Sequence, residues 1–153
     1  MKTTAKKSLG ITPGTFPIVG VGASAGGLEA LTQLLKPLPS HLRMAIIIVQ
    51  HLLPKKTSLS VTILAKKTRL PITEAKNNET VLPGRVYFIP PNHDLTLMGG
   101  VLKLSLRPPA KMPHMPINTF LRSLAVDQKG NAIGIILSGT ATDGTKGLLS
   151  IKE

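Results

Sequence analysis

A single serine in a glycine-rich turn is the first residue of this chain that could do chemistry. The apolar residues 16–21 stop at the turn Gly-Ala-Ser-Ala-Gly-Gly of residues 22–27, after which leucines recur at helical spacing. This pattern predicts a strand, a sharp turn and a helix. Ser24 would lie beside the helix N-terminus, where free N–H groups and the helix dipole favour negative charge. The spacing Gly22-x-Ser24-x-Gly26 is typical of a nucleophile elbow, in which the serine attacks a carbonyl carbon.

The same turn also fits a second chemistry, the binding of a dinucleotide. Gly20-x-Gly22-x-x-Ala25 has the spacing of a Rossmann-type phosphate-binding turn. That motif needs an acidic residue about 20 positions further on to hold the ribose hydroxyls. No Asp or Glu occurs between Glu29 and Glu74, so a dinucleotide-binding Rossmann-type domain remains only as the second alternative.

A reactive serine needs a general base, and the base needs an acid that orients it. His51 follows the apolar run 45–49, and Asp143 follows the apolar run 132–137 and a glycine-containing loop. Because ligand sites of open α/β sheets lie at the carboxyl ends of strands, we expect Ser24, His51 and Asp143 to meet there. Each has a commoner structural role when taken singly: a helix N-cap for Ser24, a carbonyl partner for His51 and a turn for Asp143. The order serine, histidine, aspartate differs from that of α/β-hydrolases, so that fold is not predicted.

The elements that would position these residues alternate between strand and helix. This alternation predicts an α/β fold with a doubly wound, mainly parallel sheet, helices on both faces and a β-hairpin insertion. Residues 1–15 are expected to form a flexible basic lead-in, and residues 16–153 one catalytic domain. The expected elements are strands at 44–49, 86–89 and 132–137, helices at 58–67, at 117–128 and after Gly144, and a hairpin at 95–106 turning at Gly99-Gly100.

The composition of the chain limits the kinds of molecule that it is expected to bind. Lys and Arg outnumber Asp and Glu by 19 to 7, which gives a net charge of +12, but the basic residues are scattered and aromatics make up only 3%. Nucleic-acid surfaces combine basic grooves with aromatic stacking platforms, so we expect no nucleic-acid partner. The chain has no cysteine, which excludes disulfides and thiolate chemistry. It shows neither a signal peptide nor an apolar segment of roughly 20 residues, so we expect a cytoplasmic protein without membrane insertion.

The other three histidines are weaker candidates for a functional role. His41 lies in a Pro- and Ser-containing loop and is expected to be solvated, whereas His93 could line the same cleft as His51. His114 falls in a Pro- and Met-rich stretch that is expected to be a flexible loop. No histidine pair has the helical spacing of metal ligands, so no metal site is expected.

Four ordered motifs resemble the catalytic domain of CheB-type chemotaxis protein-glutamate methylesterases. They are residues 19–30, 49–51, 86–93 and 135–144, and the resemblance extends over nearly everything from Phe16 onward. The chain is also similar to the N-terminal part of methylesterase–methyltransferase hybrid proteins. The resemblance implies a serine hydrolase that demethylates glutamate γ-methyl esters on methyl-accepting chemotaxis receptors, with methanol as product and glutamine deamidation as a related activity.

The resemblance also assigns roles to individual residues. By motif, Ser24 would be the nucleophile, His51 the base and Asp143 the orienting acid, with the Thr140 backbone N–H helping to bind the oxyanion. On physical grounds the N–H of Ala25, at the expected helix N-terminus, is a second oxyanion donor. No cofactor is implied.

Three departures from the family pattern shape the expectations about activity. Ala141 stands where the family usually has glycine, which would stiffen the loop that carries Asp143. No receiver domain precedes Phe16, so receiver or methyltransferase domains would act from other chains. The family's domain continues beyond the point corresponding to Glu153, so we expect a C-terminally truncated, incomplete sheet. The first alternative is therefore an inactive truncated remnant that acts as a receptor-docking module.

Overall fold

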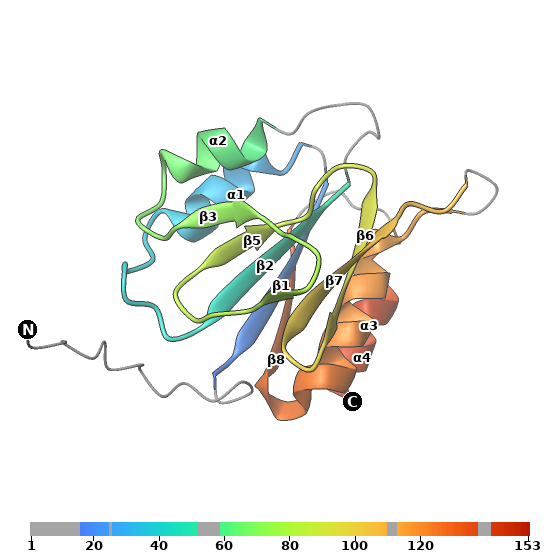
Figure 1. The fold of residues 1–153 in the computed structure, drawn as a ribbon. Coiled ribbons are helices and arrows are strands. Elements are labelled where there is room, and N and C mark those ends of the chain that lie inside the picture. Colours follow the sequence, from blue (N-terminus) through green and yellow to red (C-terminus); the bar gives the residue numbers. More distant parts are fainter. Residues whose placement is uncertain (1–15, 25, 52–58, 110–112, 138–141) are drawn as a thin grey trace, which may run out of the picture.

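A parallel sheet forms the centre of the molecule in the computed structural model, which describes residues 16–24, 26–51, 59–109, 113–137 and 142–153 (Figure 1). The sheet has five strands in the order β3-β5-β2-β1-β8, and every pairing in it is parallel. Helices cover both of its faces, which confirms the predicted doubly wound α/β fold. The strands are β1 (Ile18–Ala23), β2 (Ala45–Gln50), β3 (Ile72–Glu74), β5 (Val86–Phe88) and β8 (Ala132–Ile136).

The two central strands are buried along their whole length. All six residues of β1 and all six of β2 are buried, as expected for strands covered on both faces. Their register pairs Ala23 with Gln50, and β1 pairs with β8 from Ile18↔Ala132 to Gly22↔Ile136. The carboxyl ends of β1, β2 and β8 therefore meet at one edge of the sheet.

The helices form two groups. Helices α1 (Leu28–Leu35) and α2 (Ser60–Ala65) lie together on one face, and α3 (Pro116–Gln128) and α4 (Thr145–Lys152) lie on the other (Figure 1). A short 3-10 turn, η1 (Lys129–Asn131), links α3 to β8. Helix α2 is shorter than the helix predicted at 58–67. In the described part of the chain no helix combines the length and apolar character needed to cross a membrane.

Two glycines of β1 let α3 approach the sheet closely. A Cβ on Gly20 would lie 2.7 Å from Leu121 Cδ2, and a Cβ on Gly22 would lie 2.6 Å from Ile117 Cγ2. The space that side chains would occupy on this face of β1 is therefore filled by α3. A Rossmann-type phosphate turn would instead need these glycines in the loop after the strand, so this placement argues against the dinucleotide alternative.

A small antiparallel sheet packs beside α3. Its order is β4-β7-β6, built from β4 (Glu79–Thr80), β6 (His93–Met98) and β7 (Val101–Leu106). The predicted hairpin with a Gly99-Gly100 turn is confirmed, and both glycines have positive φ, at 59° and 72°. The Asp127 carboxylate of α3 accepts the N–H groups of both turn glycines and ties the hairpin to the helix.

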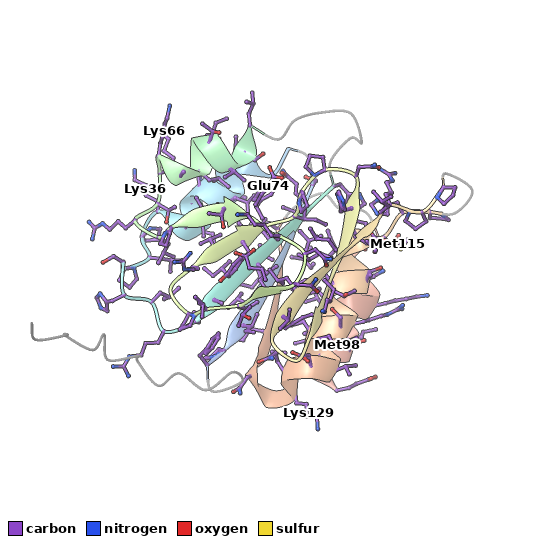
Figure 2. All side chains as sticks on the ribbon, viewed as in Figure 1. Lys36, Lys66, Glu74, Met98, Met115 and Lys129 are labelled. Carbon is purple, nitrogen blue, oxygen red and sulfur yellow. The ribbon has the colours of Figure 1, made fainter. Side chains whose placement is uncertain are left out.

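The basic residues are spread over the surface. Lys36 and Lys66 point outward near α1 and α2, and Lys129 points outward at the far end of α3 (Figure 2). All three side chains are exposed. This distribution agrees with the scattered basic residues of the sequence.

Candidate active site

Ser24 and His51 follow directly after the two central strands. The last register pair of β1 and β2 is Ala23↔Gln50, and the N–H of His51 donates to the carbonyl oxygen of Ala23 at 3.2 Å. Neighbouring strands are about 4.8 Å apart, so Ser24 and His51 begin from adjacent backbone positions. The parallel pairing therefore brings a hydroxyl and an imidazole to the same edge of the sheet, as the sequence predicted.

The half-buried Ser24 does not cap the helix that follows it. Helix α1 begins at Leu28, its N-cap is Gly27, and no side chain bonds the first amides. Ser24 Oγ makes no hydrogen bond to His51 in the described part of the chain. Contacts between a nucleophile and its base are often long before substrate binds. The Ser24 hydroxyl is therefore not occupied as a helix N-cap, which is the structural role that would compete with its use as a nucleophile.

The Gln50 side chain holds the backbone of the serine turn. Gln50 Nε2 donates to the Ser24 carbonyl oxygen at 2.7 Å, and that oxygen also accepts the Gly27 N–H at 2.9 Å. Gln50 is only 2% exposed, and its Oε1 accepts a hydrogen bond from Ser60 Oγ at 3.3 Å. Sequence reasoning gave Gln50 no role. The available signal was a polar residue closing an otherwise apolar strand.

His51 and Asp143 form a short polar contact. His51 Nε2 lies 2.7 Å from Asp143 Oδ2, although the two residues are 92 positions apart in the chain. The His51 side chain is 34% exposed and that of Asp143 only 4%. An ionised carboxylate can only accept hydrogen bonds, so Nε2 carries the proton and Nδ1 has a free lone pair. Nδ1 is therefore the imidazole atom that can take a proton from a hydroxyl.

The Asp143 carboxylate is fixed by the first turn of α3. Its Oδ2 accepts the N–H of Ile117 at 3.1 Å, and its Oδ1 accepts the N–H of Asn118 at 2.8 Å. The side chain of Met115, the N-cap residue of α3, accepts no hydrogen bond from the first backbone amides of the helix. Asp143 therefore caps this helix from a distant segment, and its buried charge is stabilised by two amides and the helix dipole.

A second histidine–carboxylate pair lies beside the first. His114 Nε2 is 2.6 Å from Asp94 Oδ1, with the two side chains 15% and 14% exposed. The His114 ring stands edge-on to that of His51, with centroids 6.3 Å apart and planes at 83°. His114 lies outside helices and strands as expected, but it is largely buried and bonded, so the prediction of a flexible position is wrong. Its anchor, Asp94, was not singled out in the sequence.

The His114 side chain also borders a cavity of about 220 Å³. The cavity is partly open to solvent, and Asp94, Met115 and Thr119 also line it. Among the described residues, the half-buried Arg107 contributes a positive charge to its wall. His93 lines a smaller hollow with Gln50 and His114, and its Nδ1 bonds the Pro91 carbonyl oxygen at 2.8 Å.

The remaining site predictions are not tested by the structure. Ala25 and Thr140, the two expected oxyanion donors, lie outside the described residues. Within the described ranges, no three His, Asp or Glu side chains gather in a way that could hold a metal ion.

Comparisons with known proteins indicate one family over most of the chain. Residues 19–153 match the family model described as CheB methylesterase. A protein-glutamate methylesterase/protein-glutamine glutaminase of Burkholderia lata is 36% identical over 143 residues, covering 91% of this chain and 39% of the relative. A relative of the same name from Photorhabdus laumondii is 36% identical over 140 residues, covering 89% of this chain and 40% of its own length.

A solved structure agrees with these relatives. The CheB methylesterase catalytic domain of Thermotoga maritima superposes with a TM-score of 0.78 at 31% identity, covering 90% of this chain and 75% of that domain. The chain spans about 40% of the length of the curated relatives that it matches. On the match over residues 19–153 and this shared fold, the chain belongs to the CheB methylesterase family.

Proposed function

We propose that this domain is a protein-glutamate methylesterase, which hydrolyses γ-methyl esters of glutamate side chains on methyl-accepting chemotaxis receptors and releases methanol. The observation that carries the proposal is the 2.7 Å contact between His51 and Asp143 at the strand ends where Ser24 also lies. The names of the relatives, protein-glutamate methylesterase/protein-glutamine glutaminase, support the same reaction and add glutamine deamidation.

In the first half of the reaction, Ser24 Oγ attacks the ester carbonyl carbon while His51 Nδ1 takes the hydroxyl proton. Asp143 holds the ring through Nε2 and stabilises the imidazolium that forms. The backbone N–H groups of Ala25 and Thr140 are the proposed donors to the oxyanion of the tetrahedral intermediate. Collapse of this intermediate breaks the C–O bond, and methanol leaves with the proton from His51.

In the second half, water replaces methanol in the site. His51 takes a proton from the water, which attacks the glutamyl ester on Ser24, and the serine leaves with that proton. The products are a free glutamate side chain and the original enzyme. A glutamine side chain would follow the same route, with ammonia as the first leaving group.

Methanol release from a methylated receptor fragment tests this proposal. We expect Ser24→Ala and His51→Ala each to lower turnover by about three to six orders of magnitude, and Asp143→Asn to lower it less. Because the residues act as a unit, the Ser24→Ala/His51→Ala double variant should be no worse than either single variant. Ser105→Ala, on the exposed end of β7, is the matched control and should leave turnover unchanged.

Two results would contradict the proposal. Receptor binding without Ser24-dependent methanol release would favour the docking module in its place. A double variant far less active than both single variants would show that Ser24 and His51 do not act in one mechanism.

A further inference from the structure

Helices α3 and α4 cap each other through two side chains at the edge of the proposed active site. Asp143, just before α4, accepts the N–H groups of Ile117 and Asn118 at the start of α3. In the other direction, Asn118 Oδ1 accepts the N–H groups of Gly144 and Gly147, each at 2.9 Å. Asn118 thus bonds Asp143 through its backbone and the residue after Asp143 through its side chain.

The Asn118 side chain is confined as well as bonded. It is only 4% exposed, and its Nδ2 donates to Met115 Sδ at 3.3 Å, which fixes the direction of the amide. Sequence reasoning placed Asn118 within an amphipathic helix and gave it no role. A buried side-chain amide whose oxygen accepts two hydrogen bonds is held firmly in place. If either bond broke, its N–H donor would be left buried, with no water to replace the lost acceptor.

Both amides that Asn118 accepts belong to glycines that the geometry requires. Gly144 has a φ of +106°, a left-handed conformation that side chains disfavour. At Gly147, a Cβ would lie 2.7 Å from Leu121 Cβ, so this glycine lets α4 approach α3. The backbone therefore turns sharply after Asp143, and the N–H groups of Gly144 and Gly147 both donate to the Asn118 side-chain oxygen.

We propose that Asn118 is a positioning residue for catalysis, which holds Asp143 at the distance and angle that His51 requires. This inference rests on the proposed function, since Asp143 acts there by orienting His51. Loss of the Asn118 oxygen frees the Gly144 amide and lets the carboxylate move away from His51 Nε2. A misplacement of about 1 Å in a catalytic group can cost roughly 10²-fold in rate, without affecting how substrate binds.

The test compares Asn118→Leu, which removes the acceptor, with Asn118→Asp, which keeps an oxygen at the same place. We expect Asn118→Leu to lower kcat roughly 10²-fold with KM within about twofold of wild type. Asn118→Asp should recover most of that loss. The control is Gln128→Leu, at the other end of α3, where the side chain is also a buried amide at 8% exposure. It should leave kcat unchanged.

A readout without substrate separates positioning from general stability. We expect the proton between His51 Nε2 and Asp143 Oδ2 to give a downfield NMR resonance, because it would lie in a short, charge-assisted hydrogen bond. We expect Asn118→Leu to lose this resonance and Gln128→Leu to keep it. Should Asn118→Leu fail to fold, Asn118→Ser, whose shorter side chain does not reach both glycine amides, gives the same comparison.

The inference is overturned if Asn118→Leu keeps both kcat and the resonance, or if Gln128→Leu loses kcat equally. A different result would show that the proposed function itself is wrong. A wild-type chain that releases no methanol refutes that function, while the resonance of the Asn118 variants still decides whether Asn118 positions Asp143.

Discussion

Replacing Gly22 by alanine should damage catalysis through the helix that holds Asp143. The new Cβ would lie 2.6 Å from Ile117 Cγ2 and 2.9 Å from Ile136 Cδ1. Ile117 is fully buried in the first turn of α3, and its N–H donates to Asp143 Oδ2 at 3.1 Å. The substitution therefore pushes on the residue that fixes the carboxylate, two positions before Ser24 along the strand.

The distances set the size of the effect. Ordinary van der Waals contact begins at 3.4 Å, so Ile117 Cγ2 must move by about 0.8 Å. If the first turn of α3 moves with it, the Ile117 amide leaves hydrogen-bond range of Asp143. Overpacking lowers the unfolding free energy by about 1–3 kcal/mol. Alanine offsets about 0.5–1 kcal/mol of this loss, because it has less backbone freedom than glycine to lose on folding. We expect a net loss of about 1–2 kcal/mol in unfolding free energy and of roughly 10–100-fold in kcat.

Gly20→Ala is the matched control for this prediction. It lies on the same face of β1, where its Cβ would meet Leu121 Cδ2 at 2.7 Å, but these contacts are further along α3 from Asp143. Denaturant unfolding should show similar destabilisation in both variants, and methanol release at saturating substrate should fall only for Gly22→Ala. Equal kcat in the two variants at matched folded fraction would refute the reasoning.

Two further predictions concern Gln50 and Tyr87. Gln50→Leu removes the bond to the Ser24 carbonyl oxygen, so we expect about 1–3 kcal/mol less stability and a lower kcat in the methanol assay; an unchanged kcat would show that the serine turn holds itself. Burial raises the pKa of Tyr87 above its ordinary value of 10.0, against the opposing effect of the Leu82 N–H bonded to its hydroxyl. As pH rises through about 10, the unfolded chain releases this proton first, so unfolding free energy should fall more steeply in wild type than in Tyr87→Phe. Urea titrations at about pH 9 and 11 check this, and parallel curves would contradict it.

Long periodic elements of the fold were predictable because their burial leaves a pattern in the sequence. The continuous apolar run of β2 and the alternating hairpin with its double glycine were both identified correctly. Strands β3 and β4 were missed because they are short and mostly polar and exposed, whereas the equally short β5 is apolar and fully buried. Their pairing depends on neighbours that the local sequence does not specify.

The site divides in a similar way. Ser24, His51 and Asp143 could be singled out because each follows a strand whose end faces the same edge of a parallel sheet. Gln50 and Asn118 could not be assigned, because the backbone groups that they bond at the site, the Ser24 carbonyl and the Gly144 amide, each lie 26 residues away along the chain. His114 was misjudged for the same reason, since its burial follows from the bond to Asp94 on another element.

Because Asp143 caps α3, folding as well as catalysis selects for a carboxylate at this position during evolution. Charged groups in active sites commonly reduce stability, so that their loss leaves a protein inactive but more robust. Here Asp143 Oδ2, which contacts His51, also accepts the Ile117 N–H, and Oδ1 accepts the Asn118 N–H. The carboxylate thus satisfies the first amides of a helix whose own N-cap residue supplies no side-chain cap. A chain that lost its reaction would still be selected to keep this carboxylate for folding. In the descendants of this domain, an aspartate here would therefore be weaker evidence of activity than the serine at the end of β1.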